Sequence, residues 1–342
     1  MRAMKVLGIE TSCDECAAAV VEDGQRILSN VIATQIPYHA PWNGVVPEIA
    51  SRKHTEWIYA VVKEALDKAG IGAADVDAAA VTSRPGLLGS LLVGLSFAKA
   101  FAWARNIPFA AVDHMLAHLY APRLLPENKP DYPFLGLLVS GGHTIICRAD
   151  NFDNITVLGT TIDDAVGEAF DKTAKFYNFG YPGGAVIDKM SRNGDSEAFR
   201  FPMPSLHKGD HRYDVSYSGL KTAVINQLEM FRVKDGGIKN EDIAASFQKT
   251  AVEILIRSLL NAVQDTGLST IVAGGGVAAN SYLRARLAEQ TGLCCIFPPP
   301  DLCGDNGAMI AGIGYHYLSR GGQSPLNVTA SARVTGFKKK YP

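Results

Sequence analysis

Two histidines separated by four positions, His114 and His118, are the residues whose type and spacing could do chemistry in this chain. If segment 114–118 is helical, both imidazoles lie on one face about one turn apart and can bind one metal ion. Asp305, far away in the sequence, could add a carboxylate. Two neutral nitrogens and one carboxylate make a divalent-metal site with open positions, suited to iron, zinc or manganese. A histidine pair that stands alone is more often exposed or capping, so the surrounding chain must decide.

Length and composition indicate a globular protein of two lobes. The chain has 342 residues, of which 47% are hydrophobic and 20% charged. No apolar run is long enough to cross a membrane and no signal peptide precedes the first strand pattern, so we expect a cytoplasmic protein without membrane contact. Six scattered cysteines fit a reducing compartment, and Cys13-x-x-Cys16 lacks the second pair of a zinc site. The net charge of −1 means that any RNA contact would use a local patch or a helper protein.

The elements that must position His114 fill the first third of the chain. Asp23-Gly24 predicts a tight hairpin between two strands, and Pro47 is suited to the first turn of a helix that Gly70 ends. Residues 10–14 form a polar turn whose hydroxyls and backbone N–H groups could hold phosphate, or an ordinary hairpin turn. The predicted elements are strands over 5–9, 16–23, 26–35, 78–83 and 107–112 and helices over 47–66 and 91–105.

The second half of the chain repeats the layout of its beginning. Residues 133–150 have the order of residues 5–23: an apolar strand with a central glycine, a short Ser/Thr/Gly turn and a second apolar strand ending on an acidic residue. Residues 155–161 then match the third strand. The repeat predicts an internal duplication, with two α/β lobes facing each other across a cleft. Ser140-Gly141-Gly142 would be the second phosphate-cradling turn, because two glycines let a backbone approach an anion closely.

Further elements of the second half supply more candidate contacts. Residues 269–276 predict a strand that ends in three glycines before a helix opened by Asn280, which is a common nucleotide cradle. The polar, basic and aromatic stretch 201–222 could contact RNA phosphates and bases, or be an insertion loop without a partner. Asp305 is expected at a helix N-terminus, where its carboxylate could be a cap instead of a ligand. The remaining predicted elements are helices over 164–178 and from 240 to a stop at Gly267, a last strand over 294–300 and a mobile tail.

Together these segments resemble the TsaD family, also called Gcp or YgjD and once described as O-sialoglycoprotein endopeptidases. The matching stretches run in order along nearly the whole chain. They are GIETSCDE at 8–15, NGVVPEIASRKH at 43–54, PGLLGSLLVG at 85–94, HMLAH at 114–118, LLVSGGHT at 137–144, DDAVGEAFDKTAK at 163–175, YPGG at 181–184, YSGLKTA at 217–223, GGGVAAN at 274–280 and GDNGAMIA at 304–311.

The resemblance implies a duplicated actin/Hsp70/hexokinase-type ATPase fold with a central cleft between the lobes. It implies lobes over 1–125, completed by a C-terminal helix within 305–330, and over 131–304, followed by a tail over 331–342. It also implies transfer of threonylcarbamoyl from threonylcarbamoyl-AMP to the exocyclic amine of the adenosine 3′ of the anticodon in ANN-decoding tRNAs. A TsaB-type partner of related fold and a TsaE-type ATPase are the protein partners that it implies.

The family's site residues carry over position by position. His114, His118 and Asp305 match the ligands of one divalent metal per chain, expected to be iron(II), with zinc as the alternative. The positions that match the family's nucleotide-substrate residues are Leu138, Val139, Ser140, Gly141, Gly142, Asp171, Gly184, Asp188 and Asn280.

Three positions depart from the family pattern. Leu116 replaces the usual glutamate, Asp113 stands where histidine or asparagine is common, and Arg84 replaces a small residue. They keep open a paralogue that only scaffolds partner proteins. A zinc peptidase is disfavoured because its H-E-x-x-H motif needs a glutamate between the histidines. A small-molecule kinase on the same fold would have no evident use for the two histidines.

Overall fold

The computed structural model describes residues 3–125, 129–152, 154–206, 211–232 and 239–333. The chain forms two compact units, Met1–Lys129 with Gly304–Gly336, and Pro130–Cys303 with Phe337–Pro342. Most of the predicted tail, 334–342, lies outside the described residues. Across the described part of the chain, no helix has both the length and the apolar character needed to cross a membrane.

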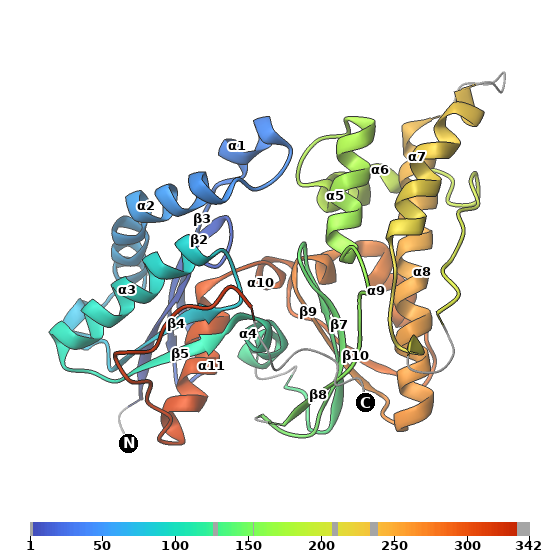
Figure 1. The fold of residues 1–342 in the computed structure, drawn as a ribbon. Coiled ribbons are helices and arrows are strands. Elements are labelled where there is room, and N and C mark those ends of the chain that lie inside the picture. Colours follow the sequence, from blue (N-terminus) through green and yellow to red (C-terminus); the bar gives the residue numbers. More distant parts are fainter. Residues whose placement is uncertain (1–2, 126–128, 153, 207–210, 233–238, 334–342) are drawn as a thin grey trace. The chain divides into compact units, whose positions relative to one another are not determined.

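The first unit is built on a five-stranded mixed sheet of order β3-β2-β1-β4-β5 (Figure 1). Strands β1 to β3 form an antiparallel meander, whereas β4 and β5 run parallel to β1. The predicted hairpin is present, because Asp23 and Gly24 both have positive φ, as a tight turn between strands requires. The strands are β1 (Lys5–Glu10), β2 (Glu15–Glu22), β3 (Arg26–Thr34), β4 (Ala78–Arg84) and β5 (Phe109–Asp113).

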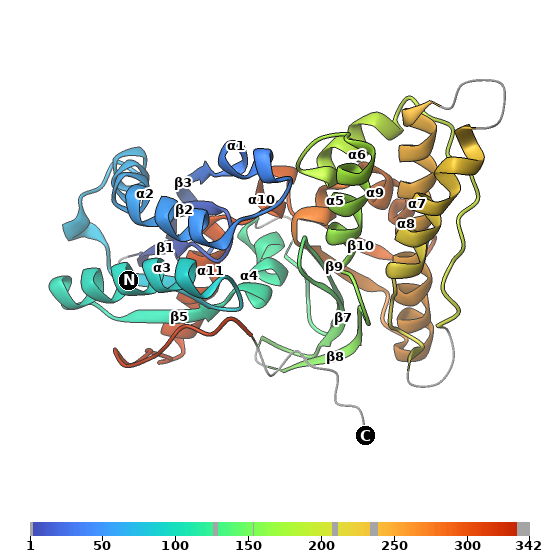
Figure 2. The same ribbon diagram turned by 45° about the horizontal axis from the view of Figure 1, so that its top comes forward.

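Helices cover both faces of this sheet. On one face, α2 (Pro47–Lys68) and α3 (Leu88–Arg105) pack side by side, as both ribbon views show (Figure 2). Leu7 and Ile9 of β1 point toward these helices and belong to the apolar core between them and the sheet. The short helix α1 (Ile36–His39) precedes α2.

The opposite face of the sheet carries α11 (Gly307–Ser319) at very close range. A Cβ atom on Gly8 would lie 2.2 Å from the carbonyl oxygen of Gly307, and one on Gly314 would lie 2.3 Å from the Cβ of Ala80. The helix can approach the strands in this way only because small residues face each other at these points. This contact fixes the start of α11, and therefore the segment that carries Asp305.

The second unit repeats the strand order of the first. Its sheet has the order β10-β9-β6-β7-β8, with β6 central, an antiparallel meander through β7 and β8, and parallel β9 and β10. Strand for strand, β6 to β10 correspond to β1 to β5, so the predicted internal duplication is confirmed. The strands are β6 (Phe134–Val139), β7 (Thr144–Ala149), β8 (Ile155–Thr160), β9 (Thr270–Gly274) and β10 (Cys294–Ile296).

The helices of the second unit enclose its core. Leu135, Leu137 and Val139 of β6 face a large apolar cluster to which most of these helices contribute. The 27-residue helix α8 ends at Gly267 with φ +70°, as predicted. The helices are α5 (Val166–Tyr177), α6 (Gly183–Ser191), α7 (Ser218–Arg232), α8 (Asn240–Thr266), α9 (Ser281–Ala288) and α10 (Pro300–Cys303).

The last predicted strand is too long, whereas the last predicted helix is present. The strand expected over 294–300 ends at Ile296, because Pro298 and Pro299 cannot donate to a strand ladder and α10 begins at Pro300. The C-terminal helix expected within 305–330 is present over 307–319, and the chain turns at Gly321, which has positive φ.

The polar stretch 201–222 is tied to the second unit at most of its described positions. Tyr217 is fully buried and donates its hydroxyl to the carbonyl of Ala251, so it cannot stack on a base. Arg212 pairs with Asp265. The prediction of RNA contact is therefore wrong for Tyr217, whose side chain fills the core. His207 and Lys208 lie outside the described residues.

Candidate functional site

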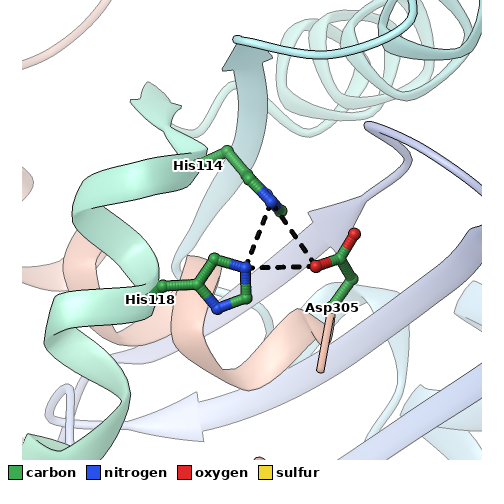
Figure 3. A group of neighbouring side chains, drawn as sticks. All are labelled: His114, His118 and Asp305. Carbon is green, nitrogen blue, oxygen red and sulfur yellow. Dashed lines mark hydrogen bonds and ion pairs between the residues drawn. The ribbon is translucent and has the colours of Figure 1, made fainter. Parts of the chain in front are cut away.

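His114 and His118 lie on α4 (His114–Tyr120), which starts directly where β5 ends. The helical spacing predicted for the pair is present, and both imidazoles are buried. Asp305 lies just before α11, and its carboxylate meets the two rings (Figure 3). All three residues belong to the first unit, so one compact unit holds the whole group.

The distances within this triad fit one metal ion. The two Nε2 atoms are 3.2 Å apart, and Asp305 Oδ1 is 3.1 Å from His118 Nε2 and 3.4 Å from His114 Nε2 (Figure 3). Ligands about 2.1 Å from a shared ion are about 3.0–3.4 Å apart at octahedral or tetrahedral angles. Two imidazoles and a carboxylate arranged on one side of an ion are also the donor set of many non-haem iron sites. Among the described residues, this is the one group of three or more His, Cys, Asp or Glu side chains close enough to hold a metal.

Asn306, and not Asp305, caps helix α11. The Asn306 side chain is buried and accepts a hydrogen bond of 3.0 Å from the backbone N–H of Met309, while its amide donates to the carbonyl of Gly304 at 2.9 Å. The alternative considered for Asp305, a helix cap, is therefore wrong. Its neighbour takes that role, and the Asp305 carboxylate contacts the histidines.

We expect Asn306→Ala to lower the free energy of unfolding by about 1–2 kcal/mol, because the Met309 N–H loses its buried acceptor. Urea denaturation of the metal-free protein measures this change. Asn327→Ala, at an exposed position of the same unit, is the matched control and should change stability by less than about 0.5 kcal/mol. Equal effects of the two substitutions would contradict the capping role.

Glu10 is a contact of the triad that the sequence did not reveal. It ends β1, is fully buried, and its Oε2 lies 3.1 Å from His114 Nδ1. Ser12 Oγ lies 3.3 Å from the same nitrogen. The one signal in the sequence is a carboxylate that directly follows an apolar strand, and the predicted polar turn over 10–14 includes that residue.

The two carboxylates of the site favour a positive charge between them. Burial opposes protonation of His114, but the carboxylates of Asp305 and Glu10 outweigh it and raise the pKa of His114 to about 9. For His118, burial lowers the pKa, and the nearby charge of His114 acts in the same direction. Burial alone would raise the pKa of Glu10, yet the charge and hydrogen bond of His114 lower it. In the metal-free site, the carboxylates of Glu10 and Asp305 thus stabilise the positive charge of protonated His114. A bound metal ion would take the place of that charge.

The departures beside the histidines have local explanations. Asp113 caps α4, because its Oδ1 accepts hydrogen bonds from the backbone N–H groups of Met115 at 2.9 Å and Leu116 at 3.3 Å. Arg84 lies 3.4 Å from the other carboxylate oxygen of Asp113. The side chain at position 116 is two residues from each histidine and does not share their helix face. None of these residues replaces a member of the triad.

The second unit contains the nine other predicted residues. Leu138 and Val139 are buried in β6, so only their backbone could touch a ligand. By contrast, a Cβ added to Gly141, Gly142 or Gly184 would meet nothing within 4 Å. Beside the Ser140–Gly142 turn lies the N-terminus of α5, where a Cβ on Gly167 would be 2.5 Å from the Ser140 carbonyl oxygen. An open glycine turn next to a helix N-terminus suits an anion.

Hydrogen bonds hold the predicted acidic residues in place. Asp171 Oδ1 accepts from the backbone N–H of Gly183 at 2.8 Å, which ties α5 to α6. Asp188 accepts from the N–H and the hydroxyl of Ser281 at 2.9 and 2.7 Å, which ties α6 to α9. Asn280 caps α9, as predicted, and donates to Gln248.

The glycine turn before α9 packs against the end of β6. Gly275 has φ +93°, and a Cβ there would lie 2.4 Å from the carbonyl oxygen of Val139. Because β6 and β9 are parallel neighbours, the two glycine turns follow strands that end at the same edge of the sheet. The predicted residues of the second unit are thus connected to one another through α5, α6 and α9.

Comparison with known proteins identifies the family. The sequence profile of TsaD, tRNA N6-adenosine threonylcarbamoyltransferase, matches residues 26–312. A protein of that name from Treponema denticola is 67% identical over 98% of this chain and 99% of its own length. The Treponema pallidum (strain Nichols) protein is 55% identical over 98% of this chain and 95% of its own, and the Borreliella burgdorferi (strain ZS7) protein is 52% identical over 99% and 96%.

Solved structures with little sequence similarity share the fold. Full-length HypF in its phosphate- and nucleotide-bound form has a TM-score of 0.61 at 14% identity, over 96% of this chain and 47% of that one. Component A of (R)-2-hydroxyglutaryl-CoA dehydratase from Acidaminococcus fermentans has a TM-score of 0.55 at 14% identity, over 92% and 99%. These proteins have the actin/Hsp70-type ATPase fold, so that predicted fold class is confirmed. With relatives this similar over nearly its full length, the chain belongs to the TsaD family of tRNA N6-adenosine threonylcarbamoyltransferases.

Proposed function

We propose that this chain transfers threonylcarbamoyl from threonylcarbamoyl-AMP to the N6 amine of the adenosine 3′ of the anticodon in ANN-decoding tRNAs. We propose further that the transfer depends on one divalent metal, with iron(II) preferred to zinc, held by His114, His118 and Asp305. The observation that carries the proposal is the convergence of these three ligand atoms to 3.1–3.4 Å in a chain whose relatives bear the transferase name.

The chemistry of the donor decides what the protein must do. Threonylcarbamoyl-AMP is a mixed anhydride, so its carbonyl carbon is already activated and no covalent nucleophile on the protein is needed. The adenosine N6 attacks that carbon, the bond from carbon to the phosphate oxygen breaks, AMP leaves and the amine loses a proton. The protein has to orient the carbonyl toward the amine and to stabilise charge on the carbonyl and the departing phosphate.

In this proposal the second unit binds the AMP part of the donor. The Ser140–Gly142 turn, with its open glycines and the adjacent α5 N-terminus, would hold the phosphate. Asp171, held by the backbone N–H of Gly183, and Asp188, held by Ser281, would bind ribose hydroxyls. Gly184 and the Asn280 turn would complete the contacts with the nucleotide.

The triad of the first unit would hold the metal. A divalent ion bound there supplies a Lewis acid that can polarise or orient the threonylcarbamoyl group. Three protein ligands would leave further coordination positions of the ion for a substrate. Because both imidazoles are buried, their nitrogens are shielded from solvent and their orientation is restricted by packing.

A TsaB-type partner and a TsaE-type ATPase are part of the proposal, because tRNA is a large anion and this chain has a net charge of −1. A helper protein could supply the basic surface that the chain lacks overall. The stretch 201–222 contributes less than its composition suggests, since Tyr217 is buried and Arg212 is paired.

Reconstitution tests the proposed function. The purified chain, loaded anaerobically with iron(II), is combined with threonylcarbamoyl-AMP and an ANN-decoding tRNA, with and without the two partners, and nucleosides are measured by chromatography and mass spectrometry. We expect modified adenosine in the complete mixture and none with a tRNA that lacks the target adenosine. Absence of product in the complete mixture, with the adenylate still intact, would contradict the proposal.

A further inference from the structure

Glu10 is the buried carboxylate closest to the metal triad that is not itself a member of it. It is the last residue of β1 and has no exposed surface. Such a carboxylate is costly to bury unless its oxygens accept hydrogen bonds. Here Oε1 accepts from the backbone N–H of Ser12, and Oε2 accepts from the hydroxyl of Thr82 and lies 3.1 Å from His114 Nδ1. The carboxylate therefore connects the ends of β1, β4 and β5.

The contact with Nδ1 determines which nitrogen of His114 can bind a metal. A carboxylate only accepts hydrogen bonds, so the nitrogen that faces it must carry a proton. With Nδ1 protonated, Nε2 is the nitrogen that can present a lone pair, and Nε2 is the atom that faces His118 and Asp305. A carboxylate behind a ligating histidine is a common way to fix the ring and to make the ligand nitrogen more basic.

The two histidines differ in this respect. Within the described residues, Nδ1 of His118 is buried and has no hydrogen-bond partner. The orientation of the triad therefore depends on His114 and the carboxylate behind it. Charge is a second reason to assign Glu10 to the metal site. The negative charges of Glu10 and Asp305 together would balance one divalent cation in a buried site.

We propose that Glu10 is a positioning residue for the metal centre, which holds His114 with Nδ1 protonated and balances the charge of the bound ion with Asp305. This inference rests on the metal site of the proposed function. Ser12 and Thr82 support it, because the Ser12 N–H donates to one oxygen of the Glu10 carboxylate and the Thr82 hydroxyl donates to the other.

Glu10→Gln changes charge and hydrogen bonding while it keeps the size of the side chain. If the amide oxygen accepts from the Ser12 N–H, the amide NH₂ faces His114 Nδ1. Nδ1 must then accept a hydrogen bond, so the neutral ring carries its proton on Nε2, the nitrogen that would bind the metal. If the amide is flipped, its NH₂ meets the Ser12 N–H, and two donors oppose each other. Either arrangement weakens metal binding.

The experiment measures zinc and cobalt(II) affinity by competition with a chromophoric chelator. We expect Glu10→Gln to bind both ions about 10- to 100-fold more weakly than the parent. In zinc-loaded protein, the downfield Nδ1–H signal of His114 should be present in the parent and lost or strongly shifted in the variant, which a purely structural role would not cause. The matched control is Glu22→Gln, because Glu22 of β2 lies opposite Lys5 at the other end of β1 and its carboxylate pairs with Arg26. Its metal affinity should stay within about twofold of the parent.

Two reference variants keep the outcomes distinct. His114→Ala should lose metal binding; if it binds as the parent does, the metal site of the proposed function is wrong. If His114→Ala loses the metal while Glu10→Gln binds within twofold of the parent, only the role of Glu10 is overturned. Should Glu10→Gln fail to fold, Thr82→Val decides: removal of one hydrogen bond to Oε2 should weaken binding about fivefold, and unchanged affinity would overturn the proposal.

Discussion

Replacement of His118 with alanine is expected to weaken metal binding by at least about 100-fold and to reduce threonylcarbamoyl transfer to a similar degree. The imidazole is fully buried, and its Nε2 lies 3.2 Å from His114 Nε2 and 3.1 Å from Asp305 Oδ1. Removal leaves one nitrogen and one carboxylate, which hold a divalent ion poorly. A factor of 100 in rate corresponds to about 2.7 kcal/mol of lost transition-state stabilisation.

Metal content by mass spectrometry and product formation under the reconstitution conditions measure the two effects. Leu116→Ala is the matched control, because it shortens a side chain on the same helix without touching the ligand set. Its metal content should equal that of the parent. Full transferase activity in a metal-free His118→Ala protein would refute a role for the metal in the reaction.

Apolar runs bounded by turn residues predicted most of the strands and helices. The run from Lys5 to Ile9 and the matching run from Phe134 to Val139 form the central strands of the two sheets. Their shared layout predicts the duplication. Turn residues set the limits of several elements: Asp23-Gly24 ends β2, Pro47 opens α2 and Gly267 ends α8. These signals are local, so they could be read from the sequence.

Features that depend on distant partners could not be read in this way. Asp305 and Asn306 are both good helix caps, and only the close packing of α11 on β1 decides that Asn306 takes the role. Tyr217 looked like an RNA contact because its neighbours are polar, yet its hydroxyl meets the carbonyl of Ala251 far along the chain. Glu10 became part of the candidate site only through contacts with residues 72 and 104 positions away.

The close approach of α11 to the sheet leads to the second large expected effect. A methyl group at position 8 would lie 2.2 Å from the carbonyl oxygen of Gly307, 2.5 Å from the backbone nitrogen of Ala311 and 2.8 Å from the Ala311 Cβ. Real Cβ atoms do not approach other atoms so closely, and two of the three obstacles are backbone atoms that cannot rotate away. Gly8→Ala can therefore be accommodated only if α11 moves off β1.

We expect Gly8→Ala to lower the free energy of unfolding by about 3 kcal/mol and to weaken metal binding as well. Asp305 directly precedes the start of α11, so a displaced helix carries its carboxylate away from His114 and His118. Urea denaturation and chelator competition measure the two changes in one preparation. The combined loss is informative because position 8 itself contacts no ligand atom of the triad.

Gly72→Ala provides the control for this substitution. Gly72 is exposed in the same unit, has φ −89°, and a Cβ there would come no closer than 3.5 Å to another atom. The change should leave stability within about 1 kcal/mol of the parent and metal affinity unaltered. If Gly8→Ala behaved like Gly72→Ala, α11 could not be held against β1 as closely as described, and the position of Asp305 beside the two histidines would lose its structural basis.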